Sequence, residues 1–373
     1  MSGILQSLLA SFPLGAIQNA LYVWGSNAYG QLGLNINTTI NVSSPTQVGA
    51  DPDWASAAAS GPNDPTCAAI KTDGTLWTWG NNPYGKLGIG LVYNSRSSPV
   101  QVGALTNWAQ VSAGGRFCAA VKEDGTLWAW GGNTDGSLGT GNRTNYSSPV
   151  QVGGLTNWSL ISTEFSTCAA IKTDGTLWTW GGNLLGQQGH GDKIRRSSPT
   201  QVGALTNWST VSALAYFCSA VKTDGTLWTW GGGSSGELGT GVASSYRSSP
   251  VQVGGLTNWA RSDNGNAFCA AIKTDNTLWM WGGNFGGQLG QGNLISKSSP
   301  VQVGGAVWEK VSVVNHAMAI RTDGTLWGWG SNPSGQLGIN STTNVSSPVQ
   351  VGALANWTFV AAGTNATFAG LNE

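Results

Sequence analysis

The side chains that could carry out catalysis are few and scattered in this chain of 373 residues. The two histidines, His190 and His316, have no neighbouring motif that indicates a Ser-His-Asp or Cys-His arrangement. Carboxylates that could work as an acid–base pair are missing from the variable segments, where Glu164 and Glu237 stand singly. Neither a Cys-x-x-Cys motif nor a histidine pair indicates zinc. We therefore expect a protein that is not an enzyme, with no catalytic residue, no metal and no cofactor.

The cysteines recur at one position of a sequence repeat. Equivalent strands of stacked sheets lie ~10 Å apart, whereas a disulfide requires Cα atoms within roughly 7 Å of each other. The sequence therefore predicts buried free thiols, which favour assembly in a reducing compartment. The five positions are Cys67, Cys118, Cys168, Cys218 and Cys269.

Basic and aromatic residues gather in the segments whose sequence varies from repeat to repeat. A basic residue precedes Ser-Ser-Pro in four of the repeats. Such cations attract an acidic protein patch or an anionic surface glycan, and the alternative is ordinary solvated loop charge. The candidate partner-binding residues are Arg96, Arg116, Arg143, Tyr146, Phe165, Arg195, Arg196, Tyr216, Tyr246, Arg247 and Lys297.

The bulk composition argues against other classes of partner. Charged residues make up 9% of the chain, and Lys+Arg equals Asp+Glu at 17 each. Nucleic-acid binding and polybasic membrane docking both require clustered cations. No apolar run approaches the ~20 residues of a membrane-spanning helix. We therefore expect protein partners, no nucleic acid and no membrane span.

The element that must position the candidate residues is a repeat built on Leu-Trp-Thr-Trp-Gly. It occurs seven times with small variations, and its leucines lie 55, 51, 50, 50, 51 and 48 residues apart. Thirteen of the 20 Trp belong to these copies, and the other seven also recur once per repeat. A fixed period of this length predicts an array of one supersecondary unit. The leucines are Leu21, Leu76, Leu127, Leu177, Leu227, Leu278 and Leu326.

Each repeat is predicted to form four strands, for example residues 108–113, 117–122, 126–131 and 149–152. The dipeptide Asp124-Gly125 is typical of a tight hairpin between the second and third strands. Both faces of these two strands are apolar, as expected when sheets are covered on both sides. The sequence thus predicts an all-β fold, a seven-bladed β-propeller of four-stranded blades.

The two ends of the chain are predicted to share one blade. Residues 367–373 align with residues 66–72, a second strand, while residues 20–25 are a third strand without its first two partners. In this alignment Gln18 and Asn19 take the place of the hairpin turn. A composite blade made from both termini would close the ring without leaving an open sheet edge. Residues 18–373 are therefore predicted to be a single propeller.

Alternating strand directions divide the connections between two faces. The nearly constant turns lie on one face, where Lys or Arg alternates with Asp, and we expect a solvated, charge-balanced ring there. The variable connections lie on the other face, where binding is usually tuned, although neutral drift would give the same pattern. Among them we expect loops 140–146, 190–196 and 240–247 to meet the ligand.

Residues 1–17 lie outside the repeat. Their apolar residues have helical spacing, and Pro13 with Gly15 would end a short helix. We expect this segment to be an anchor helix that binds an assembly partner; docking on its own propeller and a signal peptide are the alternatives. The anchor residues are Ile4, Leu5, Leu8, Leu9 and Phe12.

These motifs resemble the regulator of chromosome condensation repeat family, whose members are seven-bladed propellers. The resemblance covers residues 20–373 and rests on the Asp-Gly-Thr-Leu-Trp-x-Trp-Gly copies, Gly-Gln-Leu-Gly at 30–33 and 335–338, and Ala113-Gly114. The family often has a histidine before the second strand, which implies a structural role for His316. Kelch repeats have a similar period but a different arrangement of glycine and aromatic residues.

Three functions remain open at this point. The first is a non-enzymatic interaction or structural module that binds a partner through one face, such as a phage or other virion appendage or surface component. The alternative is a regulatory propeller such as a small-GTPase exchange factor. The third is ultraviolet sensing, although the Gly-Trp-Arg-His-Thr segment of the resembling photoreceptors is missing where Gly115–Cys118 stand. For location, a surface assembly made in a reducing cytoplasm is one hypothesis and a cytoplasmic protein the other.

Overall fold

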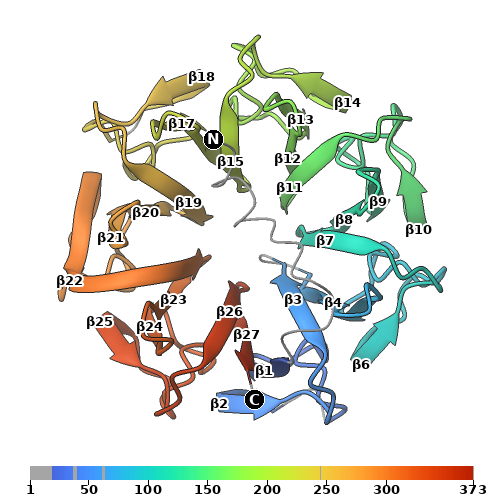
Figure 1. Ribbon diagram of the computed structural model, residues 1–373, viewed down its shortest axis with the longest axis horizontal. Helices are drawn as coiled ribbons and strands as arrows, with labels where there is room; N and C mark the ends of the chain where they lie inside the picture. The colour runs from blue at the N-terminus through green and yellow to red at the C-terminus, as the bar shows by residue number, and fades with distance from the viewer. Residues whose placement is uncertain (1–18, 37–39, 61–63, 244, 373) are drawn as a thin grey trace.

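The computed structural model describes residues 19–36, 40–60, 64–243 and 245–372, which form 27 strands joined by turns, with no helix among them. The strands form seven blades around a central axis (Figure 1), and the innermost strands of the blades line a channel there. Each blade has four antiparallel strands that follow one another from the channel to the rim. The all-β, seven-bladed fold class is therefore confirmed. The predicted anchor residues in segment 1–17 lie outside the described residues.

The blades are numbered from the first complete one. Blades 1 and 2 consist of β3 (Trp54–Ala59), β4 (Thr66–Lys71), β5 (Leu76–Gly80), β6 (Arg96–Gln101), and β7 (Trp108–Ala113), β8 (Phe117–Lys122), β9 (Leu127–Gly131), β10 (Tyr146–Gln151). Blades 3 and 4 consist of β11 (Trp158–Glu164), β12 (Thr167–Lys172), β13 (Leu177–Gly181), β14 (Arg196–Gln201), and β15 (Trp208–Ala213), β16 (Phe217–Lys222), β17 (Leu227–Gly231), β18 (Arg247–Gln252). Blade 5 consists of β19 (Trp259–Gly265), β20 (Phe268–Lys273), β21 (Thr277–Gly282) and the first half of β22 (Lys297–Val313). Blade 6 takes the second half of β22 with β23 (His316–Arg321), β24 (Leu326–Gly330) and β25 (Val345–Gln350).

Blade 7 is made from both ends of the chain, in agreement with the predicted closure. Its strand order is β2 (Val42–Gln47), β1 (Asn19–Gly25), β27 (Ala366–Asn372) and β26 (Trp357–Ala362). The predicted alignment of the C-terminal strand is wrong by one residue. Trp24 pairs with Thr367, as Trp79 pairs with Cys67, so Thr367 takes the cysteine position. Asn19 pairs with Asn372 and belongs to the strand, not to a turn.

One strand runs through two blades. β22 serves as the outer strand of blade 5 and the innermost strand of blade 6, which joins the two blades into one seven-stranded sheet. The segment between Val303 and Trp308 is one residue shorter than the corresponding segment between Val152 and Trp158 and lacks its Thr-Asn pair. The shorter link has no room for the turn found elsewhere, so the strand continues through it.

Tryptophans hold neighbouring blades together. The second Trp of each motif is fully buried, and its indole nitrogen donates to a backbone carbonyl of the preceding blade; for Trp130 the acceptor is the Lys86 carbonyl at 2.9 Å. Apolar clusters also straddle the junctions: Phe117 and Leu127 of blade 2 pack with Trp158 and Trp180 of blade 3. Because each blade buries its faces only against its neighbours, the core is continuous around the ring.

The central channel is lined by a ring of side-chain oxygens from the innermost strands. In these blades the side chain of the fifth residue of the innermost strand accepts a hydrogen bond. The donor is the backbone N–H of the sixth residue of the innermost strand in the next blade. Ser112 accepts from Thr163 at 3.0 Å, and Asp263 accepts from Val313 at 2.9 Å. Positions 58 and 361, in blades 1 and 7, are alanines, which have no such acceptor.

The turn face carries the B-to-C hairpins (second to third strand) and the links between blades. In blade 2, Thr126 donates its hydroxyl to Asp124 at 2.6 Å, and the Trp128 indole donates to that hydroxyl at 2.9 Å. Lys122 is 7% exposed, with its amine 3.9 Å from the centroid of Trp128 and 5.0 Å from that of Trp108. The expectation of a solvated, charge-balanced ring is therefore wrong for this lysine, which is held by cation–π contacts.

Candidate functional site

The loop face is opposite the turn face and carries the connections from first to second strand and from third to fourth strand of every blade. The third-to-fourth connections differ in sequence, yet most of them are fixed to the blade by the same buried residue. This is the asparagine of the Gly-Gly-Asn or related segment that follows the third strand. It occurs as Asn82, Asn133, Asn183, Asn284 and Asn332, each 0% exposed.

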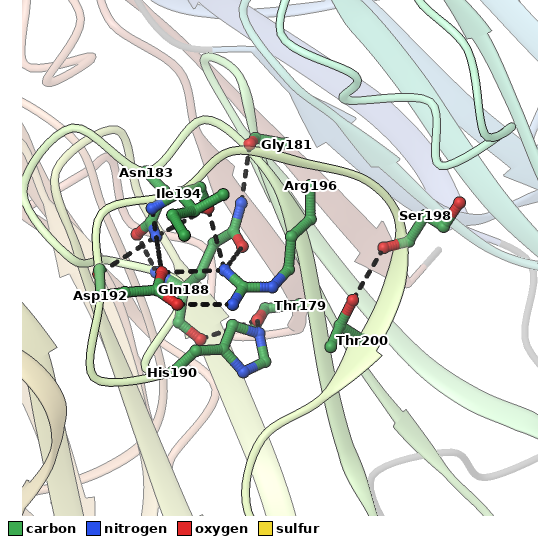
Figure 2. Close-up of polar contacts among 10 residues, drawn as sticks. All are labelled: Thr179, Gly181, Asn183, Gln188, His190, Asp192, Ile194, Arg196, Ser198 and Thr200. Atoms are coloured by element: carbon green, nitrogen blue, oxygen red, sulfur yellow. Dashed lines mark hydrogen bonds and ion pairs between the residues drawn. The ribbon is translucent and has the colours of Figure 1, made fainter.

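Figure 2 shows this anchoring in blade 3. The side-chain nitrogen of Asn183 donates to the backbone carbonyls of Asp192 and Ile194 at 3.2 and 3.0 Å. Its side-chain oxygen accepts from the backbone N–H of Gln188 at 3.0 Å. Asn284 holds two carbonyls of the blade 5 loop in the same way, those of Asn293 and Ile295. The tips of these loops are therefore preorganised on a rigid support.

Arg196 closes the blade 3 loop from the other side (Figure 2). Its two terminal nitrogens contact the two carboxylate oxygens of Asp192 at 3.1 and 2.7 Å, and one of them also donates to the Ile194 carbonyl at 2.9 Å. The guanidinium and the loop amide of Ile194 hold the pKa of Asp192 down to about 2. Arg196 is thus occupied within its own loop and leaves Ile194 exposed at the tip.

His190 contacts a hydroxyl group of its own blade. It lies at the base of the same loop, with Nε2 3.0 Å from the Thr179 hydroxyl (Figure 2). Burial, aided by the positive charge of Arg196, lowers the pKa of His190 to about 4, so the ring is neutral at physiological pH. His316 is fully buried between blades 6 and 7, where its Nε2 lies 2.7 Å from the Thr367 hydroxyl. The two histidines are therefore separate packing residues.

The residues predicted to bind a partner all lie on the loop face but differ in availability. Arg143, Arg195, Tyr216, Tyr246 and Arg247 are exposed. The half-buried ones are Arg96, Arg116, Tyr146, Phe165, Arg196 and Lys297. Two of the arginines are neutralised by carboxylates, because Arg195 lies 2.8 Å from Asp135 of blade 2 and Arg196 pairs with Asp192.

Arg116 is held between two aromatic rings near the channel. Its guanidinium carbon lies 5.5 Å from the centroid of Tyr84 and 5.7 Å from that of Phe165, so residues of blades 1, 2 and 3 meet there. Phe165 has a φ of 48°, a backbone conformation that is strained for a bulky side chain. Gly115 makes room for that strained turn, since a Cβ there would lie 3.0 Å from the Phe165 Cα.

The two faces differ in charge although the chain is neutral overall. On the described part of the loop face the acids are outnumbered by cations, and the turn face has the opposite balance. The loop-face cations are Lys86, Arg96, Arg116, Arg143, Lys193, Arg195, Arg196, Arg247 and Lys297, and the loop-face acids are Asp64, Asp135, Glu164, Asp192 and Glu237. Lys86 is buried, where desolvation lowers its pKa to about 8 and its amine donates to the Gly115 carbonyl at 2.7 Å.

The loop-supporting asparagines and the exposed apolar loop tips were not predicted from the sequence. The recurrence of Gly-Gly-Asn near the end of the third strand marks Asn183 as a repeat residue. Its role in supporting the loop could not be predicted, because the carbonyls that it binds belong to loops without a common sequence. Exposed tips such as Ile194 and Phe285 have no recurring sequence signal, because they lie in segments that differ from repeat to repeat. The searched residues of the described chain contain no group of three or more His, Cys, Asp or Glu that could hold a metal ion. In the same part of the chain, no helix is long and apolar enough to cross a membrane.

The repeat unit matches a known family model along almost the entire propeller. The model of the regulator of chromosome condensation (RCC1) repeat matches residues 18–63, 73–121, 124–163, 174–221, 224–272, 275–317 and 323–369. The chain belongs to the RCC1 repeat family. The predicted resemblance is thereby confirmed.

Curated relatives share parts of this RCC1-like propeller. The X-linked retinitis pigmentosa GTPase regulator of Canis lupus familiaris is 39% identical over 132 residues, which cover 34% of this chain and 13% of that protein. The probable E3 ubiquitin-protein ligase HERC3 of Homo sapiens is 41% identical over 75 residues, 20% of this chain and 7% of that protein. The matched segments thus span a small fraction of these longer relatives.

Solved structures agree with the fold at low sequence identity. Prp20p from Saccharomyces cerevisiae superposes with a TM-score of 0.87 at 18% identity, covering 100% of this chain and 96% of that chain. Human WBSCR16 gives a TM-score of 0.83 at 20% identity, covering 95% of this chain and 99% of that chain. These similarities establish the RCC1-like propeller fold.

Proposed function

We propose that this RCC1-like propeller is a regulatory or scaffolding module that binds a protein partner through its loop face. The observation that carries the proposal is the combination of rigid loop supports with variable tips that leave cations and apolar side chains exposed. Asn183 and Asn284 fix the loop backbones, so little conformational entropy is lost when a partner binds. The turn face offers less variation, because its connections repeat nearly the same sequence.

The test compares partner capture by variants of the two faces. The loop-face variant carries Tyr216→Ser, Tyr246→Ser and Arg247→Ser, all at exposed positions. The matched turn-face control carries Leu155→Ser and Leu205→Ser, whose side chains are also about half exposed. Each protein is immobilised and incubated with native extract, and bound proteins are quantified by mass spectrometry. We expect a partner that is retained by the parent and the control and lost from the loop-face variant; equal retention by all three proteins would contradict the proposal.

Regulation of a small GTPase is the more specific candidate within this proposal. The names of relatives favour it: one is a GTPase regulator, and the work on the Prp20p structure concerns binding to Gsp1p and histones. A virion appendage and a surface-glycan ligand receive no support from the similar proteins. The assay is release of a fluorescent GDP analogue from a panel of purified small GTPases. Acceleration by the parent but not by the loop-face variant would support exchange activity, and unchanged release across the panel would leave only the scaffolding function.

A further inference from the structure

In the described part of the chain, the exposed apolar side chains of the loop face form two groups, one on blades 7 and 1 and a larger one on the consecutive blades 3, 4 and 5. Blade 3 contributes Leu184 and Ile194, blade 4 contributes Tyr216 and Tyr246, and blade 5 contributes Phe285 and Leu294. Ile194 is 65% exposed and Phe285 is 73% exposed. We call these six residues the apolar arc; blades 3, 4 and 5 are neighbours in the ring (Figure 1). Clustered exposed apolar side chains of this kind mark interaction sites in soluble proteins.

The loops on either side of these blades have a different character. The blade 2 loop at 140–145 consists of Thr, Gly, Asn and Arg, and the blade 6 loop at 340–344 consists of Asn, Ser and Thr. Both loops are supported by the same asparagine as their neighbours, at Asn133 and Asn332. Since the support is shared and the tips differ, loop architecture alone does not require the apolar side chains of blades 3 and 5.

Among the described residues of blades 3 to 5, the arc also carries cations without exposed, unpaired acids to neutralise them. Lys193 lies 5.9 Å from the ring centroid of Tyr246, a contact that connects the blade 3 and blade 4 loops. Arg247 is exposed and Lys297 is half-buried at the ends of the following loops. The acids of blades 3 to 5 on this face are Asp192, which is paired with Arg196, and Glu164 and Glu237, which are buried.

The apolar tips are held in place before any partner arrives. Asn183 and Arg196 both bond the carbonyl of Ile194, and Asn284 bonds the carbonyl of Ile295, next to Leu294. In blade 4 the asparagine is replaced by Gly233, whose carbonyl accepts from the Ser245 amide at 3.2 Å and ties the loop just before Tyr246. Preorganised apolar anchors are typical of residues that dominate binding energy.

We propose that the apolar arc binds an acidic segment of a partner protein in which apolar side chains alternate with Asp or Glu. The apolar residues of the segment pack on Ile194, Tyr246 and Phe285, and its carboxylates meet Lys193, Arg247 and Lys297. An acidic segment without apolar residues leaves the arc unburied, and an apolar segment without acids leaves the cations uncompensated. This inference rests on the proposed function, because it assigns the partner chemistry to one part of the loop face.

The probe is a displayed library of random twelve-residue peptides, selected on the intact protein. We expect the selected peptides to combine Asp or Glu with aromatic or aliphatic residues. Their Kd should rise about tenfold or more in the variant Phe285→Ser, Leu294→Ser, as expected for apolar anchors. The variant Lys193→Ser, Arg247→Ser should weaken binding and reduce its dependence on salt, since exposed charge pairs are screened. The control variant Arg143→Ser, Thr342→Ala, on the polar blades 2 and 6, should bind like the parent.

The possible outcomes separate this inference from the function on which it rests. Some peptides could bind both arc variants as tightly as the parent but lose affinity for the control variant or for Tyr93→Ser of blade 1. That result would show that the apolar arc is not the binding site, while a binding function of the loop face would remain. Selected peptides whose affinity depends only on acids, with no loss in Phe285→Ser, Leu294→Ser, overturn the alternating chemistry. Failure to select any peptide that responds to a loop-face variant counts against both proposals. All variants should melt at the parent temperature, because the changed side chains are exposed.

Discussion

The indole nitrogen of Trp24 donates a hydrogen bond of 2.8 Å to the backbone carbonyl of Gln336, a residue 312 positions later in the chain. The same bond recurs at every blade junction, for example from Trp180 to Ser137 and from Trp230 to Gln187. At every junction the chain also passes directly from one blade to the next, as it does from blade 6 to blade 7 through residues 351–356. Blade 7 has no covalent connection between β1 and β27, so hydrogen bonds and packing alone keep its two halves together.

Removal of one indole nitrogen tests this ring of junctions. Trp24→Phe and Trp180→Phe each lose one buried hydrogen bond and part of a ring, which should lower the free energy of unfolding by about 2–3 kcal/mol. Trp180→Ala should cost about 3–5 kcal/mol, because the whole side chain is fully buried. Chemical denaturation followed by circular dichroism measures these values. A Trp180→Ala protein as stable as the parent would contradict the role of the junction.

Deletion of residues 366–373 tests closure by the two ends. It removes β27 and leaves unpaired backbone groups along β1 and β26, which neighbour it in blade 7. Unpaired strand edges promote association with other chains, so we expect aggregation and a large loss of stability. Size-exclusion chromatography with light scattering provides the measurement. Deletion of residues 1–15, which lie outside the described residues, is the control. A 366–373 deletion that stays monomeric with an unchanged melting temperature would disprove the closure.

The repeat made the blades predictable, since its tryptophans and small strand residues are core positions in every copy. Register at the C-terminus was not predictable to the residue. Residues 367–371 are apolar or small on both faces, so a shift by one places no charged side chain in the core. The structure resolves the choice by geometry: Thr367 donates to the Gln336 carbonyl at 2.8 Å, as Cys67 contacts the Gln31 carbonyl.

Departures from the repeat are explained by contacts with residues distant in the sequence. Asn276 replaces the hairpin glycine and has a φ of 64°. At the equivalent Gly125 an added Cβ would lie 2.2 Å from the Thr156 carbonyl of the following link. The link after Asn276 is the shortened one that β22 runs through, and it lacks this threonine. The sequence indicated which face carries the variable loops. It did not indicate that Arg195 and Arg196 form ion pairs with acids, because those contacts depend on how the loops fold.

Asp263 replaces a serine of the channel ring, and this substitution should make stability depend on pH. Burial raises the pKa of Asp263 from 3.8 to about 6, although Val313 and Ser212 donate to the carboxylate. The folded state therefore favours the protonated form, and stability falls as the pH rises from about 4 to about 6, by up to about 3 kcal/mol. We expect Asp263→Ser to gain stability over the parent at pH 7 but not at pH 4, measured by thermal melts. Ser162→Asp is the reciprocal control, which should introduce the same loss of stability between pH 4 and pH 7. If the stability difference between Asp263→Ser and the parent did not change with pH, the raised pKa of Asp263 would be contradicted.

His316 should give the opposite dependence, and the repeat itself supplies the substitution that tests it. Burial lowers the pKa of His316 from 6.5 to about 3, so the unfolded chain binds a proton on this residue well before the folded protein does. Its contribution to stability is therefore complete above about pH 6.5 and is lost progressively as the pH falls toward 3, by about 2 kcal/mol at pH 5. Phe117, Phe217 and Phe268 occupy the same strand position in other blades and are fully buried there.

We expect His316→Phe to reduce the difference in unfolding free energy between pH 8 and pH 5 relative to the parent. His190→Thr, which copies Thr140 and Thr240 at the equivalent loop position, should reduce it as well, because burial also depresses the pKa of His190. Urea denaturation at the two pH values gives the four free energies needed for each comparison. If His316→Phe changes stability equally at pH 8 and pH 5, then the histidine acts through packing and its bond to Thr367, and protonation of the unfolded chain does not limit the acid stability of the propeller.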